Sequence, residues 1–412
     1  MISNINSFVM QRSMLVPLVL AAGLLSACGG SSNNSTATDP TEPVVQNTLG
    51  SISVTEIAAG NAPVAVVATR AFDFSAGAVS LVTTTSPFSG VTGVNASGSD
   101  IRVRSFGDNY YVLEGFGTST LTRYSVSSPD QVALQVSTNT ANSDEDSNPH
   151  DLVFVNDEKA YLLRYGSGEI WVVNPTATDE AGFFLNTIDL SGYDADGVPE
   201  MHRGAIVDGR LYVLMQRLDQ FAPSQSAYVA VIDTATDTEV NTGTGGQFLG
   251  IELPVRNPVE LSVDPATSDI AIAAVGRFAF EGANEAEFTG GVVVVDTNDF
   301  STNLLIDDNE TLGQFTNVAV LSATSAYVVN FSSNSDNSLL SMNPNNGELG
   351  ETVAGLSDVD IDGMAIGPNG NLWVGVSDQV NPRLVVIDPA SNTALAELPL
   401  VNNPQNIVFV GN

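Results

Sequence analysis

The sequence predicts an all-β protein, a single seven-bladed β-propeller that follows a signal peptide and a flexible tether. Three observations predict this fold: short Val/Ile/Tyr runs that alternate with polar residues, turns rich in Gly, Asn, Asp and Pro, and a unit that recurs along the chain. Because 43% of the 412 residues are hydrophobic, the chain can bury a large core, which excludes disorder throughout.

The first expected element is an N-terminal leader. Residues 1–27 contain no acidic residue, a single base at Arg12 and an apolar run from Met14 to Leu25. That run is too short to span a bilayer as a stable helix and is typical of a secretory signal peptide. Residues 28–49 follow as a flexible linker, because Gly, Ser, Asn, Thr, Asp and Pro dominate its first part.

The only cysteine lies at the end of the leader, so no internal disulfide and no Cys-x-x-Cys motif is possible. Residues 25–29 read LSACG, which resembles the lipobox of bacterial lipoproteins. The resemblance implies that Cys28 is lipidated and becomes the first residue of the mature chain. Because Gly29 stands where an Asp usually retains Gram-negative lipoproteins at the inner membrane, it also implies the outer membrane. Several acyl chains on Cys28 would give stable attachment to the cell envelope.

The recurring unit occupies residues 50–412. Each unit has four strand-like segments, and the third ends in an Asp or Asn after hydrophobic residues, as at Asp233, Asp296 and Asp388. Seven starts of a first strand, 43 to 57 residues apart, predict seven blades. These starts lie near Ile101, Asp151, Arg203, Glu260, Asn317, Gly363 and Asn406.

The two ends of this region predict how the propeller closes. Residues 405–410 leave room for one strand only, whereas residues 50–95 supply three strands without a first one. We therefore expect the C-terminal strand to complete the N-terminal blade, which removes the open sheet edges. The alternative architecture is a pair of β-sandwiches, which does not explain the incomplete units at both ends.

The last full unit carries the clearest family resemblance. Residues 385–393 read VVIDPASNT and, together with residues 398–408, resemble the YVTN repeat of bacterial and archaeal propellers. Residues 362–374 also resemble NHL and gluconolactonase-type blades. Both resemblances concern repeats, so they imply the architecture and say little about function.

Composition and motif searches exclude several functions. The chain has 47 acidic and 13 basic residues and a net charge of −34, which repels nucleic acid. No phosphate-binding Gly-rich loop precedes its one mature lysine, Lys159. No His-Glu-x-x-His motif and no Gly-x-Ser-x-Gly nucleophile elbow occurs.

Polar residues at the starts of the first strands form the first candidate site. His150 and His202 are the only histidines and hold equivalent positions in adjacent blades, so we expect them to be neighbours. Two imidazoles with a carboxylate, supplied by Asp151 or Glu260, suit a transition metal. Arginines on the same mouth of the channel suit a carboxylate or phosphate. The candidate ligand-binding residues are Arg164, Arg203, Arg217 and Arg277. In the alternative interpretation, these groups satisfy one another within the protein.

Acidic loops form the second candidate site. Asp194, Asp196 and Glu200 surround a turn-forming Gly, and carboxylates in such a loop can hold calcium. Residues 358–363 resemble the start of a calcium loop but have Asn369 where the bidentate Glu belongs. The alternative for both loops is a solvated acidic rim.

Two functions from different classes follow. The leading hypothesis is a lipid-anchored binding or scaffold module of the outer membrane, which presents its loops to an envelope protein or a small anionic ligand. One version is an accessory subunit of an envelope uptake system. The alternative is a metal-dependent enzyme of lactonase type at the channel mouth, using Ca²⁺ or a transition metal. Glu260, Asn317 and Asp362 match the ligands of that type in kind.

Overall fold

The computed structural model describes residues 45–143, 146–279, 284–332 and 337–411, and the chain from Val45 onward forms one compact unit. The predicted signal peptide and the predicted lipidation site Cys28 lie outside these residues. Within the described ranges, no helix is both long enough and apolar enough to cross a membrane.

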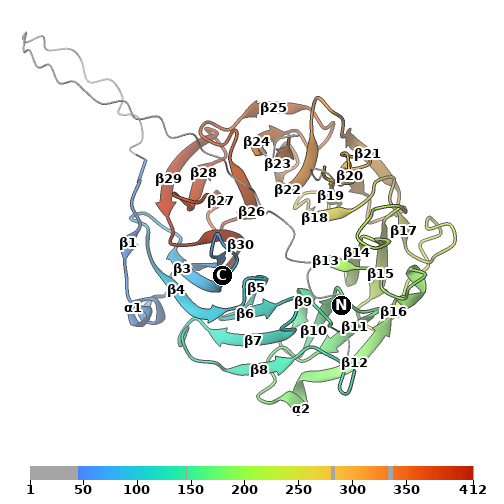
Figure 1. Ribbon diagram of the computed structural model, residues 1–412, viewed down its shortest axis with the longest axis horizontal. Helices are drawn as coiled ribbons and strands as arrows, with labels where there is room; N and C mark the ends of the chain where they lie inside the picture. Colours follow the sequence, from blue (N-terminus) through green and yellow to red (C-terminus); the bar gives the residue numbers. More distant parts are fainter. Residues whose placement is uncertain (1–44, 144–145, 280–283, 333–336, 412) are drawn as a thin grey trace, which may run out of the picture. The chain divides into compact units, whose positions relative to one another are not determined.

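The described chain forms seven sheets of four or five strands around a ring (Figure 1). The first sheet has the order β1-β4-β3-β2-β30 and consists of β1 (Gly50–Ser51), β4 (Ser89–Ser97), β3 (Gly77–Thr83), β2 (Val64–Arg70) and β30 (Asn403–Val410). The second and third consist of β5 (Ile101–Phe106), β6 (Asn109–Glu114), β7 (Thr120–Ser125), β8 (Leu134–Ser137), and of β9 (Pro149–Asn156), β10 (Lys159–Arg164), β11 (Glu169–Val173), β12 (Phe184–Asp189).

The remaining sheets follow in chain order. The fourth consists of β13 (Met201–Val207), β14 (Arg210–Met215), β15 (Tyr228–Asp233), β16 (Thr238–Glu239) and β17 (Ile251–Glu252). The fifth and sixth consist of β18 (Pro258–Val263), β19 (Ile270–Ala274), β20 (Gly291–Val295), β21 (Thr302–Asp307), and of β22 (Gln314–Ser322), β23 (Ser325–Phe331), β24 (Asn337–Met342), β25 (Leu349–Thr352). The seventh consists of β26 (Asp360–Ile366), β27 (Leu372–Ser377), β28 (Arg383–Asp388) and β29 (Thr393–Pro399). Short helical segments lie at α1 (Val54–Ala59), α2 (Glu180–Phe183) and η1 (Ser191–Tyr193).

The C-terminal strand closes the ring as predicted. β30 pairs antiparallel with β2, from Val64 opposite Val410 to Arg70 opposite Asn403. The first strands β5, β9, β13, β18, β22, β26 and β30 contact one another in turn, and β30 contacts β5 to complete the cycle. The prediction of a single seven-bladed propeller is therefore confirmed, and the β-sandwich alternative is wrong.

Packing between blades explains the apolar runs of the sequence. The second strand of a blade is buried on both faces, as in β14, where Leu211 to Met215 are all buried. Its alternate residues reach opposite neighbours: Leu211 and Val213 pack with Tyr161 of the third blade, whereas Tyr212 and Leu214 pack with Ile272 of the fifth. Each sheet thus depends on both neighbours for burial, which is why the ring folds as one unit.

Candidate binding site in the central channel

Six of the seven first strands carry a β-bulge near their start. In β9, for example, Asp151 lies opposite Leu163 and Pro149 lies opposite Arg164, which leaves one extra residue between them. The extra residues are His150, His202, Val259, Thr316, Asp362 and Gln405, which we call the bulge ring. A bulge redirects the side chain of its extra residue. The six residues of the bulge ring therefore lie around one mouth of the channel.

The two histidines of the bulge ring lie next to each other, as the sequence predicts. Their Nδ1 atoms are 3.0 Å apart, and Tyr165 stacks on His150 with a centroid distance of 4.0 Å. Burial, with a smaller contribution from Arg102, lowers the pKa of His202 to about 3 and that of His150 well below its usual range. Both imidazoles are therefore neutral at neutral pH, and one Nδ1 donates its hydrogen to the other.

The carboxylates expected beside these histidines are engaged elsewhere. Asp151 accepts hydrogen bonds from Arg104 Nε and, at 2.9 Å each, from the backbone N–H groups of Leu152 and Gly204. Glu260 accepts from Arg203 at 2.8 Å. Among the residues that the structure describes, no three His, Cys, Asp or Glu side chains are grouped so that they could hold a metal ion. Asp151 and Glu260 are each paired with an arginine, so within the described chain neither joins the two histidines in a group of three possible ligands.

Three of the four predicted ligand-binding arginines lie outside the channel lining. Arg164 is fully buried, and its three nitrogens donate to Thr138 O, Ser167 Oγ and Thr140 Oγ1. Arg217 donates in the same way to Tyr193 O, Ser226 O and Gln225 Oε1. Arg277 pairs with Glu287 at 2.6 Å. Arg164 and Arg217 would have to break these bonds to bind a ligand, whereas Arg203 lies in the channel itself.

The predicted calcium loops are tied to the protein by their own carboxylates. Asp194 accepts from Ala195 N and Gln225 Nε2, and Asp196 accepts from Val198 N. Glu200 accepts from Leu218 N at 2.8 Å, and burial raises its pKa to about 8.

Three positions were considered for a lactonase-type metal, Asp362, Asn317 and Glu260. Asp362 accepts hydrogen bonds from Ser377 Oγ and Gln405 Nε2, and Asn317 is buried on β22. Glu260 is held in its ion pair with Arg203. The three side chains belong to three different blades, and the lactonase-type metal site stays a prediction.

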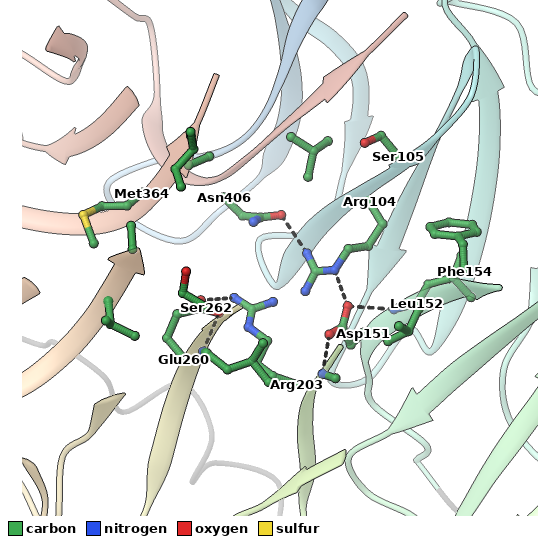
Figure 2. A pocket seen from close by; sticks show the side chains of 18 residues that line it. Arg104, Ser105, Asp151, Leu152, Phe154, Arg203, Glu260, Ser262, Met364 and Asn406 are labelled. Atoms are coloured by element: carbon green, nitrogen blue, oxygen red, sulfur yellow. Dashed lines mark hydrogen bonds and ion pairs between the residues drawn. The ribbon is translucent and has the colours of Figure 1, made fainter. Parts of the chain in front are cut away.

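The channel contains a cavity of about 390 Å³ that all seven first strands line (Figure 2). Its charged residues are Arg104, Asp151, Arg203 and Glu260, and Figure 2 shows that both guanidinium groups point into the pocket. Arg104 was not among the sequence candidates. The sequence did contain a signal for it: Arg102 and Arg104 alternate along a first strand, and alternate residues of a strand lie on one face.

The two arginines of the cavity differ in how fully they are paired. Arg104 donates to Asp151, to Val103 O and Asn406 Oδ1, and to His150 O, so each of its three nitrogens has a partner. Arg203 donates through Nη2 to Glu260, while its buried Nε has no hydrogen-bond partner within the described chain. A buried, unsatisfied donor of this kind costs free energy unless another molecule accepts from it.

The fold and the channel define the class, a seven-bladed β-propeller with a polar central cavity. No protein-family model and no curated protein sequence matches the chain. Solved structures do match it: a candidate 6-phosphogluconolactonase from Bacteroides uniformis is similar over 85% of this chain and 100% of its own, with a TM-score of 0.58 and 13% identity.

Two further structures show the same likeness. A protein from Lactobacillus plantarum matches 84% of this chain and 98% of its own, with a TM-score of 0.58 and 14% identity. The apo form of AztD from Citrobacter koseri matches 85% and 98%, with a TM-score of 0.51 and 14% identity. At such identities the comparisons show the propeller fold, and the function has to be argued from the site.

Proposed function

We propose that the chain is a lipid-anchored binding module of the bacterial cell envelope and that its ligand site is the central cavity. The observation that carries the proposal is the cavity of about 390 Å³, in which charged side chains from four adjacent blades converge. Pockets of this volume, lined by apolar surface and a few convergent polar groups, are the usual form of small-molecule sites. The Arg203 side chain is 15% exposed in this cavity and pairs with Glu260 through Nη2, so its guanidinium adds a positive charge that a ligand can reach.

The envelope location is supported by the LSACG sequence around Cys28. The described chain begins at the outer rim of the first blade, where Gln46 bridges Ala396 and β1 pairs with β4. Between Cys28 and Val45 lie 17 peptide steps, which can extend to about 58 Å at roughly 3.4 Å per residue. The described chain therefore starts at the rim of the propeller and not at the first strands that line the channel.

Two measurements test this proposal. Cys28→Ser should abolish labelling with a palmitate analogue and release the protein from the membrane fraction. A thermal-shift panel of small solutes, covering lactate, malate, gluconate, inorganic phosphate, glucose and glycerol, should contain at least one that raises the melting temperature. Ala365→Phe, which fills the apolar side of the cavity, should remove that shift. Labelling that survives Cys28→Ser, or a shift that survives Ala365→Phe, would contradict the respective half of the proposal.

Exposed loops favour a second candidate, the scaffold role within an envelope uptake system. Phe72 and Phe116 are each 50% exposed, and Val380 is 89% exposed. All three lie on loops that join second to third strands, at the same end of the propeller as the bulge ring. If a partner covers this end of the propeller, these side chains are the apolar groups that its loops offer for contact. Copurification of a stoichiometric membrane protein that is lost in a Phe72→Ser, Phe116→Ser, Val380→Ser variant would support this role.

A further inference from the structure

The Arg203–Glu260 pair is the part of the cavity that a ligand can change. Arg203 contacts Glu260 through one nitrogen only and keeps its Nε unpaired, whereas Arg104 beside it is fully engaged. The Glu260 side chain is 23% exposed and faces the cavity (Figure 2). Its second oxygen accepts from Leu261 N at 3.1 Å. Because the Arg203 side chain is also 15% exposed, an incoming anion would meet its guanidinium together with a carboxylate that competes for it.

The charged groups around Glu260 come from one side of the ring. They are Arg203 on β13, Asp151 on β9, and Arg102 and Arg104 on β5. The lining residues of β22, β26 and β30 are uncharged: Val318, Ala319, Met364, Ala365, Ile366, Asn406 and Val408. Burial raises the pKa of Glu260 to about 7, against the opposing effects of Leu261 N–H and Arg104. Near neutral pH the carboxyl group thus exchanges readily between its ionised and protonated forms.

We propose that the cavity binds a small organic acid through Arg203 and that Glu260 takes up a proton as the ligand carboxylate replaces it. This inference rests on the proposed function, because it names the ligand class of the same cavity. A guanidinium fork matches a carboxylate in planar, two-point geometry, which favours an organic acid over a neutral sugar. The side chains of Ser105, Ser262 and Asn406 line the cavity and supply hydrogen-bonding groups for hydroxyls on the ligand.

The proton follows from the charge balance. Two carboxylates that share one guanidinium cannot both remain ionised without a large cost, so one of them becomes protonated. The ligand, with a pKa well below that of Glu260, stays ionised and the proton from solvent goes to Glu260. Affinity should therefore rise as pH falls from 8 toward 6, by at most tenfold per pH unit, and level off once Glu260 is already protonated.

Calorimetry tests the inference on the full chain carrying Cys28→Ser. Titration with lactate, malate and gluconate at pH 8, in two buffers of different ionisation enthalpy, should show uptake of about one proton per acid bound. Glu260→Gln should bind at least as tightly and lose both proton uptake and pH dependence. The matched control is Glu287→Gln, since Glu287 pairs with Arg277 outside the cavity and its loss should change neither.

The role of Arg203 in binding is tested by the same calorimetric titration. Arg203→Gln should weaken binding by about 30-fold or more, because the partner of a desolvated charge is lost. Arg210→Gln, in the same blade but outside the cavity lining, should bind like the wild type. Acid binding without proton uptake, or pH dependence that persists in Glu260→Gln, would overturn the inference. Binding of glucose or glycerol alone would overturn it while leaving the proposed function intact, and binding of none of these solutes would count against both.

Discussion

The central channel is lined by two arcs of first strands, which differ in the side chains that they contribute. The charged arc is formed by β5, β9, β13 and β18, which contribute Arg104, Asp151, Arg203 and Glu260. The apolar arc is formed by β22, β26 and β30, which contribute mainly Val318, Ala319, Met364, Ile366 and Val408. Both arcs contain β-bulges at the same position, and β5 is the one first strand that has none. The repeat specifies the ring, and the side chains that face the channel specify the chemistry of each arc.

The arcs meet at two boundaries, β18 with β22 and β30 with β5, and side-chain hydrogen bonds span the second. Asn406 on β30 accepts from Val103 N at 2.9 Å and from Arg104 Nη1 at 3.0 Å. The closing strand therefore joins the apolar arc to the charged arc through a side chain as well as through its pairing with β2. Fold closure and the orientation of Arg104 are linked in this way.

The largest expected effect on stability comes from deleting the closing strand β30. Deletion of residues 403–412 removes β30, exposes the edge of β2 and takes away the contacts between β26 and β5 through β30. We expect loss of the cooperative unfolding transition in circular dichroism, because both arcs depend on closure. Truncation after Val410 is the control and should unfold like the full chain. A deletion variant that still melts cooperatively would show that the arcs are independent.

A smaller effect on stability compares a buried ion pair of the charged arc with a buried apolar side chain of the apolar arc. Asp151→Ala leaves Arg104 without its carboxylate partner in a buried setting, which costs about 3–5 kcal/mol of unfolding free energy. Val318→Ala on the apolar arc removes only methyl groups and should cost about 1–3 kcal/mol. Denaturant titration of both variants gives the comparison. Equal losses would mean that the ion pair adds nothing beyond packing.

The histidine pair gives the charged arc an acid sensitivity that the apolar arc lacks. Because the folded-state pKa values of His150 and His202 lie below the unfolded value of about 6.5, the unfolded state binds protons first as pH falls. The stability contributed by these residues is complete above pH 6.5 and should fall by about 2 kcal/mol by pH 5.5. Glu200 and Glu260, whose pKa values are raised, gain stability over the same range, so the histidines are measured by difference. Between pH 6.5 and 5.5 the wild type should lose about 2 kcal/mol relative to His150→Gln, His202→Gln in thermal melts. A parallel decline in both proteins would assign the acid sensitivity to other groups.

The sequence predicted the closed ring because the strands of each repeat can be counted along the chain. Incomplete units at residues 50–95 and 405–410 add up to one blade, and the spacing of the starts supplies the other six. The neighbouring positions of His150 and His202 followed from the same repeat. The short strand β1 and the helix α1, with the capping box of Ser53 and Glu56, were not predicted. These short segments lie outside the repeat, so its period carries no signal for them.

The partners within the site could not be predicted in the same way. A bulge shifts the pairing register by one residue, and that shift decides which side chain faces the channel. The pairing of Arg203 with Glu260 joins two blades, so it depends on how adjacent strands are staggered. Arg164 and Arg217 looked equally suited to a ligand in sequence, but backbone carbonyls of their own surroundings accept from them. Residue type showed which groups were available, and only the fold showed which were already engaged.

The smallest expected effect concerns Glu200, which lies in the loop that leads into the charged arc. Burial raises the pKa of Glu200 to about 8, so the folded state binds its proton more tightly than the unfolded state does. Stability from this group is therefore complete below its unfolded pKa and is lost as pH rises toward 8. Glu200→Gln keeps an oxygen for Leu218 N–H and removes the titration.

At pH 9 the variant should be more stable than the wild type by about 1–3 kcal/mol, after allowance for the partial exposure of the side chain. At pH 4 the two proteins should unfold alike, because Glu200 is then largely protonated in both the folded and the unfolded state. Denaturant titration at both pH values measures the difference, and Glu348→Gln, an exposed position in the blade of β22, is the control that should change at neither pH. Added CaCl₂ sharpens the result, because calcium bound at Asp194, Asp196 and Glu200 would require the ionised carboxylate. It would then stabilise the wild type at pH 9 and have no such effect on Glu200→Gln.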